Sequence, residues 1–323
     1  MPKGMTARSG EPATSGASHR LRPSVELQRR AMIRSYVIKS GVGGYAMRIH
    51  LVAMLFALFA AAFGTQAETS APEAPSAVTS APGVSYTVWA TGLDGPRGLL
   101  HNPAGGFWVI EEKAGRIIKI ANDGKITKIA EGFQGPHDID VDVNGDLYLA
   151  ETVTGRVLVI SPTGVVKTYA EDLGAPVDLA FNPQGELLVC DLAGGGVIAL
   201  RSPAERRVFV SGFKVHGLAF DKSGTTIIND YSGGRIVRVT TKGRIEVIAA
   251  DVGIAIGVAI GRFGDIYVAQ RKEGRLLRIK PDGTRIVLLD GLMSPRDPAF
   301  DLEGNLYIAE TEAGRILKIS GPF

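Results

Sequence analysis

The chain has 323 residues, of which 45% are apolar and 41 are glycine, and it contains one cysteine, Cys190. A single cysteine excludes a disulfide within the chain and a cysteine-based metal cluster. The formal net charge is +3, but residues 1–67 hold nine Lys and Arg against two Asp and Glu, and the rest of the chain holds 27 against 31. That remainder is slightly acidic and lacks the basic surface of a nucleic-acid-binding protein.

The first segment of the chain is predicted to be a leader. Residues 51–64 form an uninterrupted apolar run. It is too short to span a bilayer, which takes about 20 residues, but it is typical of the core of a signal peptide. Arg48 precedes the run, and the small-x-small sequence Thr65-Gln66-Ala67 follows it. We therefore expect a leader over residues 1–67 and a periplasmic or secreted mature protein.

Alternatives remain within this leader. Met47 stands directly before Arg48, so Met47 is the expected true start, and residues 1–46 are then an over-extended start or a long n-region. The pair Arg29-Arg30 would suit a twin-arginine signal. An uncleaved apolar helix would instead anchor the protein to the membrane.

The remaining chain divides into a linker and a repeat array. Residues 68–85 are rich in Ala, Pro and Ser and are predicted to be a flexible linker. Residues 86–323 contain six units of about 40 residues, which is the kind of period that marks a repeat fold. We call a set of equivalent positions in the six aligned units a column. One column is acidic in all units but the fifth, and its members are 40, 40, 39, 40 and 40 residues apart. Its members are Glu111, Glu151, Asp191, Asp230, Gln270 and Glu310.

Each unit is predicted to contain four short strands. In the second unit these are residues 138–143, 147–150, 156–160 and 165–170, with Asn144-Gly145 as a tight hairpin turn at positive φ. Four strands in each 40-residue unit are typical of a β-propeller, whereas a solenoid would need polar capping repeats that the array lacks. The expected fold is all-β, a six-bladed β-propeller with four antiparallel strands per blade.

The two ends of the array predict how the ring closes. Residues 86–90 resemble the fourth strand of a unit without the three strands that should precede it. The last unit ends after its third strand, at Ile319. The N-terminal strand is therefore expected to complete the last blade, which removes two open sheet edges.

An antiparallel meander places the start of the first strand and the end of the second at the same end of the ring, which we call the mouth. The acidic column lies there, and in five units an arginine follows it five residues later. We expect acid and arginine to hold the intervening loop in most units. Asp191 has Gly196 in place of its arginine and is therefore expected to be an unpaired carboxylate.

A second column at the mouth is irregular, and departures from a repeat are better candidates for function than the repeat itself. It reads Arg97, His137, Val177, His216, Ile256 and Arg296, and the next position reads Gly98, Asp138, Asp178, Gly217, Gly257 and Asp297. Imidazole and carboxylate groups can bind a divalent cation or act as general acid and base. The candidate catalytic residues are His137, His216 and Arg296, and the candidate substrate-binding residues are Arg97, Asp138, Asp178 and Gln270.

The repeat resembles a known superfamily. The sequence GNLYIAETEAGRILKI at 304–319 resembles the NHL repeat and the repeats of streptogramin (virginiamycin B) lyases, and the wider likeness is to gluconolactonase-like six-bladed propellers. The resemblance covers residues 86–320. It is specific for the fold and says less about activity, because such blades host many functions.

The resemblance implies particular roles for some of these residues. In streptogramin lyases a proline-histidine pair begins the first strand, and the histidines act with magnesium to open a lactone ring by elimination. Pro136-His137 matches this motif, and His216 matches it without the proline, although the two histidines lie two blades apart here instead of in neighbouring blades. Gluconolactonase-like enzymes have a Glu/Asn/Asp metal site at the mouth, which would correspond here to Glu151, Asp191 and Asp230 with Mg or Ca.

These observations lead to an expected function. The protein would be an exported propeller with a polar ligand site at its mouth, and a metal-assisted lyase or hydrolase for a lactone, ester or sugar-like molecule. The alternative is a non-catalytic NHL-type propeller that binds a peptide, a glycan or an envelope protein. Residues 93–100 also resemble quinone-dependent sugar dehydrogenases, but the long loop insertions of those enzymes are missing. We expect a monomer with no nucleotide cofactor, no nucleic-acid partner and no membrane contact after cleavage.

Cleavage after Ala67 predicts that the mature protein begins at Glu68. N-terminal sequencing of protein recovered from the cell envelope or the medium should return this residue or a close neighbour. A cytoplasmic product that retains Met1 would contradict the prediction of export.

Overall fold

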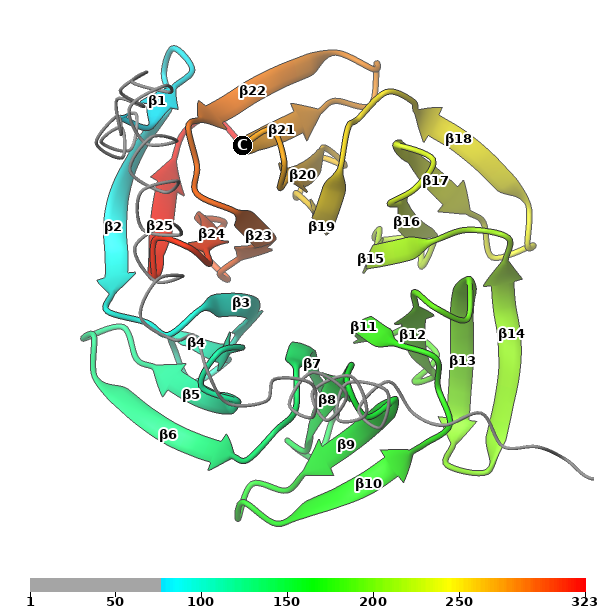
Figure 1. The fold of residues 1–323 in the computed structure, drawn as a ribbon. Coiled ribbons are helices and arrows are strands. Elements are labelled where there is room, and N and C mark those ends of the chain that lie inside the picture. The colour runs from blue at the N-terminus through cyan, green and yellow to red at the C-terminus, as the bar shows by residue number, and fades with distance from the viewer. Residues whose placement is uncertain (1–76) are drawn as a thin grey trace, which may run out of the picture. The chain divides into compact units, whose positions relative to one another are not determined.

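Six antiparallel β-sheets stand in a ring around one axis in the computed structural model, which describes residues 77–323 (Figure 1). The predicted six-bladed β-propeller with four strands per blade is confirmed. In the described range every regular element is a strand, and no helix there is long and apolar enough to cross a membrane. The predicted leader, residues 1–67, lies outside the described residues.

The first three blades follow the chain in order, and each runs from the axis outward. The first blade contains β3 (Pro96–His101), β4 (Phe107–Glu111), β5 (Arg116–Ile120) and β6 (Ile126–Glu131). The second contains β7 (Pro136–Val141), β8 (Leu147–Glu151), β9 (Arg156–Ile160) and β10 (Val166–Ala170). The third contains β11 (Pro176–Phe181), β12 (Leu187–Asp191), β13 (Gly196–Ser202) and β14 (Glu205–Ser211).

The last three blades complete the ring. The fourth contains β15 (Val215–Phe220), β16 (Thr226–Asp230), β17 (Arg235–Val239) and β18 (Ile245–Ala249). The fifth contains β19 (Ala255–Ile260), β20 (Ile266–Gln270), β21 (Arg275–Ile279) and β22 (Arg285–Asp290). The sixth contains β23 (Pro295–Phe300), β24 (Leu306–Glu310) and β25 (Arg315–Ser320), with β2 (Ser85–Thr91) as its outer strand.

The sixth blade therefore takes its fourth strand from the other end of the sequence. β2 pairs antiparallel with β25, with Tyr86 opposite Ile319 and Val88 opposite Leu317. Trp89 of β2 also packs edge-on against Phe107 of the first blade and Tyr307 of the sixth, with ring centroids 5.5 and 5.3 Å apart. The strand that closes the sheet thus also fills the seam between the first and last blades.

The apolar core lies mainly between neighbouring blades. The second strand of every blade is buried along its whole length, apart from the half-buried Trp108 in β4. Such strands are covered on both faces, which explains their continuous runs of apolar residues. Blades pack face to face through these side chains, so each blade depends on both of its neighbours.

Part of the predicted linker belongs to the fold. Within residues 68–85, β1 (Thr79–Ser80) pairs with β22 of the fifth blade. The side chain of Val84 is buried in the core of the fifth and sixth blades, and the Tyr86 hydroxyl donates a hydrogen bond to the Val78 carbonyl, 3.1 Å away. The composition of residues 68–85 did not predict this strand pairing. Val78 and Val84 alone, in a segment rich in Ala, Pro and Ser, give little indication of a strand.

The turn of the second blade also differs from the prediction. Strand β7 begins at Pro136 and ends at Val141, and the turn spans residues 142–146. Gly145 has a φ of 83°, but Asn144 is not among the positive-φ residues of the described range. The Asp142 carboxylate accepts hydrogen bonds from the amides of Asn144 and Asp146, each at 2.9 Å, so an Asp-centred loop replaces the expected two-residue hairpin.

The closure of the sixth blade predicts the effect of a truncation. A chain beginning at Gly92 lacks β1 and β2, exposes the edge of β25 and loses the Trp89 packing. We expect its free energy of unfolding to fall by at least about 3 kcal/mol and its tendency to aggregate to rise. A chain beginning at Val78 is the control and should match a chain beginning at Glu68 in urea denaturation. If the two truncated chains unfold at the same urea concentration, β2 does not contribute to closure.

Candidate functional site

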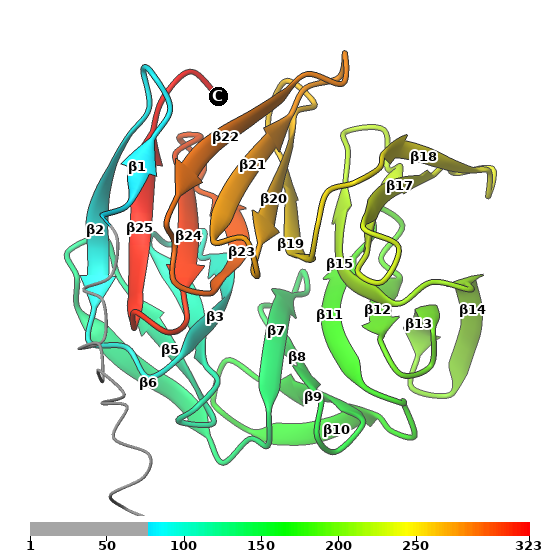
Figure 2. The same cartoon turned by 45° about the horizontal axis from the view of Figure 1, so that its top comes forward.

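The two predicted columns meet at one end of the ring. In every blade the first residue of the innermost strand is the register partner of the acidic-column residue that ends the next strand, as in Pro96 opposite Glu111 and Pro136 opposite Glu151. The same pairing recurs in the other four blades. Figure 2 shows these strand ends gathered at one face of the ring. The predicted mouth is therefore a real feature of the fold.

The acidic column holds loops, as expected for most of its members. Glu111, Glu151 and Glu310 each accept a hydrogen bond from a backbone amide 17 residues earlier, in the loop that enters the blade, at 2.7, 2.9 and 2.8 Å. The other oxygen of each carboxylate accepts from the arginine five residues later. Each acid thus joins two loops of its own blade.

The three residues suggested as metal ligands have the same structural role. Glu151 accepts from the Gln134 amide, the Thr154 hydroxyl and the Arg156 guanidinium. Asp230 accepts from Arg235 Nε at 2.8 Å and from the Gly233 amide at 3.2 Å. Their oxygens are engaged within separate blades, and no three His, Cys, Asp or Glu side chains of residues 77–323 are placed to hold a metal ion. Glu151, Asp191 and Asp230 therefore do not come together as one metal site in the part of the chain that the structure describes.

Asp191 and Gln270 also differ from the predictions made for them. Asp191 is not an unpaired carboxylate, because it accepts from the amides of Gly174, Ala175 and Gly194, each at 2.8 Å. Backbone amides have replaced the missing arginine. The Gln270 amide donates to the Val252 carbonyl at 2.7 Å, so this buried side chain also holds a loop.

The irregular column contains a hydrogen-bonded cluster centred on Arg97. The Arg97 side chain is 95% buried. Its Nη1 donates to Glu112 Oε2 at 2.8 Å, and its Nη2 donates to His137 Nδ1 at 2.9 Å and lies 3.5 Å from His216 Nε2. The two imidazole rings stack with centroids 6.1 Å apart. The structure therefore brings together three of the predicted site residues from the first, second and fourth blades.

Arg97 fixes the protonation of both histidines. A guanidinium has only donors, so the nitrogens that face it must be acceptors, which places the His137 proton on Nε2, 3.6 Å from Glu112 Oε1. Burial, with the positive charge of Arg97, lowers the pKa of His137 to about 4. Burial, followed by Arg97, also holds the pKa of His216 well below its usual value. Both rings are neutral at pH 7.

Glu112 is the charged partner of this cluster. Burial opposes its ionisation, but the contacts with His137 and Arg97 outweigh that effect and lower the pKa of Glu112 to about 2. It is therefore ionised throughout the physiological range and too weak a base to accept a proton in catalysis. Its role is to balance the charge of Arg97 and to orient His137.

Arg296 is buried near this cluster with part of its guanidinium unpaired. Its side chain is 5% exposed, and Nε has no hydrogen-bond partner. Burial, with the neighbouring Arg97 and Arg271, lowers the pKa of Arg296 to about 10, so it remains charged at pH 7. A buried guanidinium with an unpaired donor is costly unless a ligand pairs with it.

The aspartates of the next position join blades to one another. Asp138 Oδ2 accepts from the Leu179 amide of the third blade at 3.4 Å, and Oδ1 occupies space that a side chain at Gly98 would need. Asp178 is buried and accepts from the Leu218 amide of the fourth blade. Burial, with repulsion among Asp138, Asp178 and Asp297, raises the pKa of Asp138 and of Asp178. Both predicted substrate-binding aspartates thus have structural partners.

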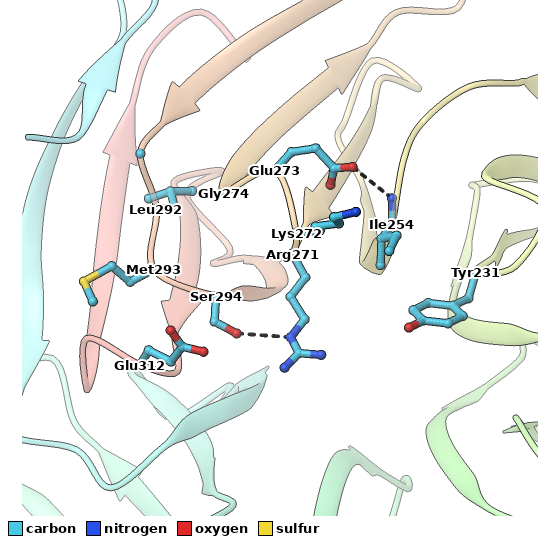
Figure 3. Close-up of a pocket in the computed structure, with 11 residues that line it drawn as sticks. Tyr231, Ile254, Arg271, Lys272, Glu273, Gly274, Leu292, Met293, Ser294 and Glu312 are labelled. Atoms are coloured by element: carbon cyan, nitrogen blue, oxygen red, sulfur yellow. Dashed lines mark hydrogen bonds between the residues drawn. The ribbon is translucent and has the colours of Figure 1, made fainter. Parts of the chain in front are cut away.

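A pocket of about 640 Å³ opens beside the cluster between the fourth, fifth and sixth blades. Its walls include Tyr231, Ile254, Arg271, Met293, Ser294 and Glu312. Arg271 Nε donates to Ser294 Oγ at 3.2 Å, and its guanidinium points toward the ring interior (Figure 3). The Tyr231 ring lies 5.8 Å from the His216 ring, so the pocket and the Arg97 cluster are contiguous.

The sequence reasoning missed Glu112, Tyr231 and Arg271. All three occupy the position directly after the acidic column, where the other units have Thr152, Leu192 and Thr311. The two threonines bind the carbonyl of the proline that begins the next blade, which is the structural use of this position. Like the column that contains His137 and His216, this position varies from unit to unit. It lies one residue after the acidic column and was not considered in the sequence analysis.

The structural role of Glu151 predicts the effect of removing it. Glu151→Ala should lower the free energy of unfolding by about 2 kcal/mol or more, because the Gln134 amide and Arg156 lose their partner. Glu131→Ala, at an exposed acid that pairs with Lys128, is the control and should have no measurable effect. Magnesium or calcium should leave the melting temperature of the unmodified protein unchanged. Stabilisation by either ion that disappears in Glu151→Ala would restore the metal assignment.

Comparison with known proteins supports the fold alone. No protein-family model and no curated protein sequence matches the chain. Among solved structures it is similar to a streptogramin B lyase at 15% identity and a TM-score of 0.60, over 74% of this chain and 98% of the other. It is similar to a gluconolactonase from Xanthomonas campestris at 14% and 0.66 (74% and 90%), and to regucalcin, a calcium-binding protein, from Agrobacterium tumefaciens at 18% and 0.62 (74% and 96%). The chain thus shares the six-bladed β-propeller fold of these proteins.

Proposed function

We propose that the mouth is an enzyme site for a small polar molecule that carries a lactone or ester carbonyl, and that the protein is an exported lyase or hydrolase. The observation that carries this proposal is the hydrogen bonding of Arg97 to His137 and His216 beside an open pocket. Neutral histidines next to guanidinium groups combine a proton acceptor with stabilisation of a developing negative charge. Lyase and lactonase propellers among the structural neighbours agree with it, at the level of the fold.

The geometry favours His216 as the proton acceptor. His137 Nδ1 is held by Arg97 at 2.9 Å, whereas His216 Nε2 lies at 3.5 Å, the limit of a hydrogen bond. The lone pair of His216 is therefore the easier one to free for a substrate or water proton. His137 is then a positioning residue that fixes Arg97 together with Glu112.

The arginines would supply the electrostatic part of the reaction. In both ester hydrolysis and lactone elimination a base removes a proton while negative charge develops on an oxygen of the substrate. Donors already oriented in a buried site stabilise that charge most effectively. Arg97 and Arg296 are 95% buried or more, and their guanidinium groups need no metal ion to act in this way.

A non-catalytic propeller that binds a peptide, glycan or envelope protein is the second candidate. It is favoured by the fact that the imidazole nitrogens facing Arg97 already accept hydrogen bonds, which leaves a site composed mainly of donors. Turnover separates the two candidates, since a binding site would hold the same ligands without changing them.

The assignment of His216 predicts a loss of activity on substitution. In assays of lactones and carboxylic esters, His216→Ala should lower kcat by about 100-fold or more, the usual size of a general-base contribution. His101→Ala is the matched control and should leave kcat unchanged, because His101 packs edge-on against Phe107 at the end of β3 away from the mouth. If the unmodified protein turns over none of these compounds, or if both variants match it, the binding propeller becomes the better account.

The lowered histidine pKa values predict the pH profile of that activity. The base must be neutral, and the folded protein keeps it neutral below the usual pKa of about 6.5. The rate should therefore stay level as the pH falls from 8 through about 6 and should decline only at more acidic values. A decline centred near pH 6.5 would show that the base is a solvated imidazole and not buried His216.

A further inference from the structure

The inner part of the mouth carries an excess of positive charge. Arg97 and Arg296 lie buried there, and Arg271 reaches the same region from the pocket wall. Glu112 pairs with Arg97 at 2.8 Å, and Asp297 lies close enough to both buried arginines to interact with them. Of these five groups three are guanidinium groups and two are acids, and the exposed Lys272, Glu273 and Glu312 lie along the wall of the same pocket.

Unpaired donors accompany this excess charge. Arg296 Nε lacks a hydrogen-bond partner, and so does His216 Nδ1, which must carry the ring proton because Nε2 faces Arg97. Both side chains are more than nine-tenths buried. Buried polar groups are normally paired, so these donors indicate that the free protein presents an incomplete site.

We infer that the pocket binds a small molecule with a single carboxylate, held by the guanidinium group of Arg271 in the pocket wall and by that of Arg296, which is buried behind the wall close enough to interact with Arg271, and approached by the Tyr231 hydroxyl. Planar guanidinium groups match a carboxylate with two parallel hydrogen bonds. This inference rests on the proposed function and adds the chemical class of its ligand, a carboxylic acid whose lactone or ester lies toward His216.

The charge of the surroundings favours a monoanion over a phosphate. A phosphate monoester carries nearly two negative charges at pH 7, whereas a carboxylate carries one. Glu273 and Glu312 line the same pocket, and they would repel a second negative charge at its rim. Burial, followed by repulsion from Arg97 and Arg271, lowers the pKa of Arg296, and a bound anion would offset that repulsion.

Calorimetric titration with matched acids and esters tests this inference. The probes are glucuronate, phenylacetate and lactate, each beside its methyl ester, with glucose 6-phosphate as the dianion. At least one acid should bind about tenfold more tightly than its ester, and the difference should shrink as salt rises from about 50 to about 500 mM. Arg271→Gln should remove that preference, because it deletes the exposed half of the clamp and leaves the buried cluster intact.

Arg275→Gln is the control for the charge change. Arg275 lies in the same blade and pairs with Asp290 at the outer strand, so this variant should keep the acid affinity within about twofold. Equal affinity for every acid and its ester, or tighter binding of glucose 6-phosphate, would overturn the inference. An equal loss of acid affinity in both arginine variants would also overturn it, since only net charge would then matter. The titrations are repeated in His216→Ala, which lacks the proposed base and should not turn the esters over. A failure there leaves the ester and lactone assays to judge the proposed function separately.

Discussion

Closure of the ring by the pairing of β2 with β25 is the constraint on which the mouth depends. A propeller blade buries its faces only against two neighbours, so an open array would leave two apolar faces and two strand edges exposed. Once the ring is closed, six innermost strands begin around a single axis. Arg97 and His216, separated by 119 positions in the sequence, can then approach within 3.5 Å. No local interaction could produce that contact.

The same closure places charged groups where water is largely excluded. A guanidinium as buried as Arg97 would be strongly disfavoured without a nearby acid, and Glu112 supplies one. The free-energy cost of burying charge also determines the protonation of His137 and His216. A protonated imidazole beside buried Arg97 would add a second positive charge to the same site. Neutral histidines are therefore a consequence of the packing. The arrangement couples three blades through the Arg97 side chain, whereas Arg296 Nε has no hydrogen-bond partner.

The fold was predictable because the repeat expresses it many times. Glycine turns, strand-length apolar runs and the acidic column recur in six units, so a weak signal in one copy is supported by the others. The site was only partly predictable. His137, His216, Arg97 and Arg296 were found as departures from the repeat, and the structure places them at the mouth. Glu151, Asp191 and Asp230 were predicted as metal ligands, whereas the structure shows them holding loops, because an acid that holds a loop and an acid that binds a metal look alike in sequence. Their hydrogen bonds to backbone amides depend on loop geometry, which residue types do not reveal.

The state of the histidines is the most direct test of this account. Nitrogen NMR of the protein with labelled imidazoles reports the charge and the tautomer of each ring as the pH changes. We expect the His137 ring to stay neutral, with Nδ1 as acceptor, until the pH approaches about 4, and the His216 ring to stay neutral well below pH 6.5. In Arg97→Gln both rings should titrate at higher pH than in the unmodified protein. Rings that titrate near pH 6.5 in the unmodified protein, with no change in Arg97→Gln, would contradict the claim that buried Arg97 controls the site.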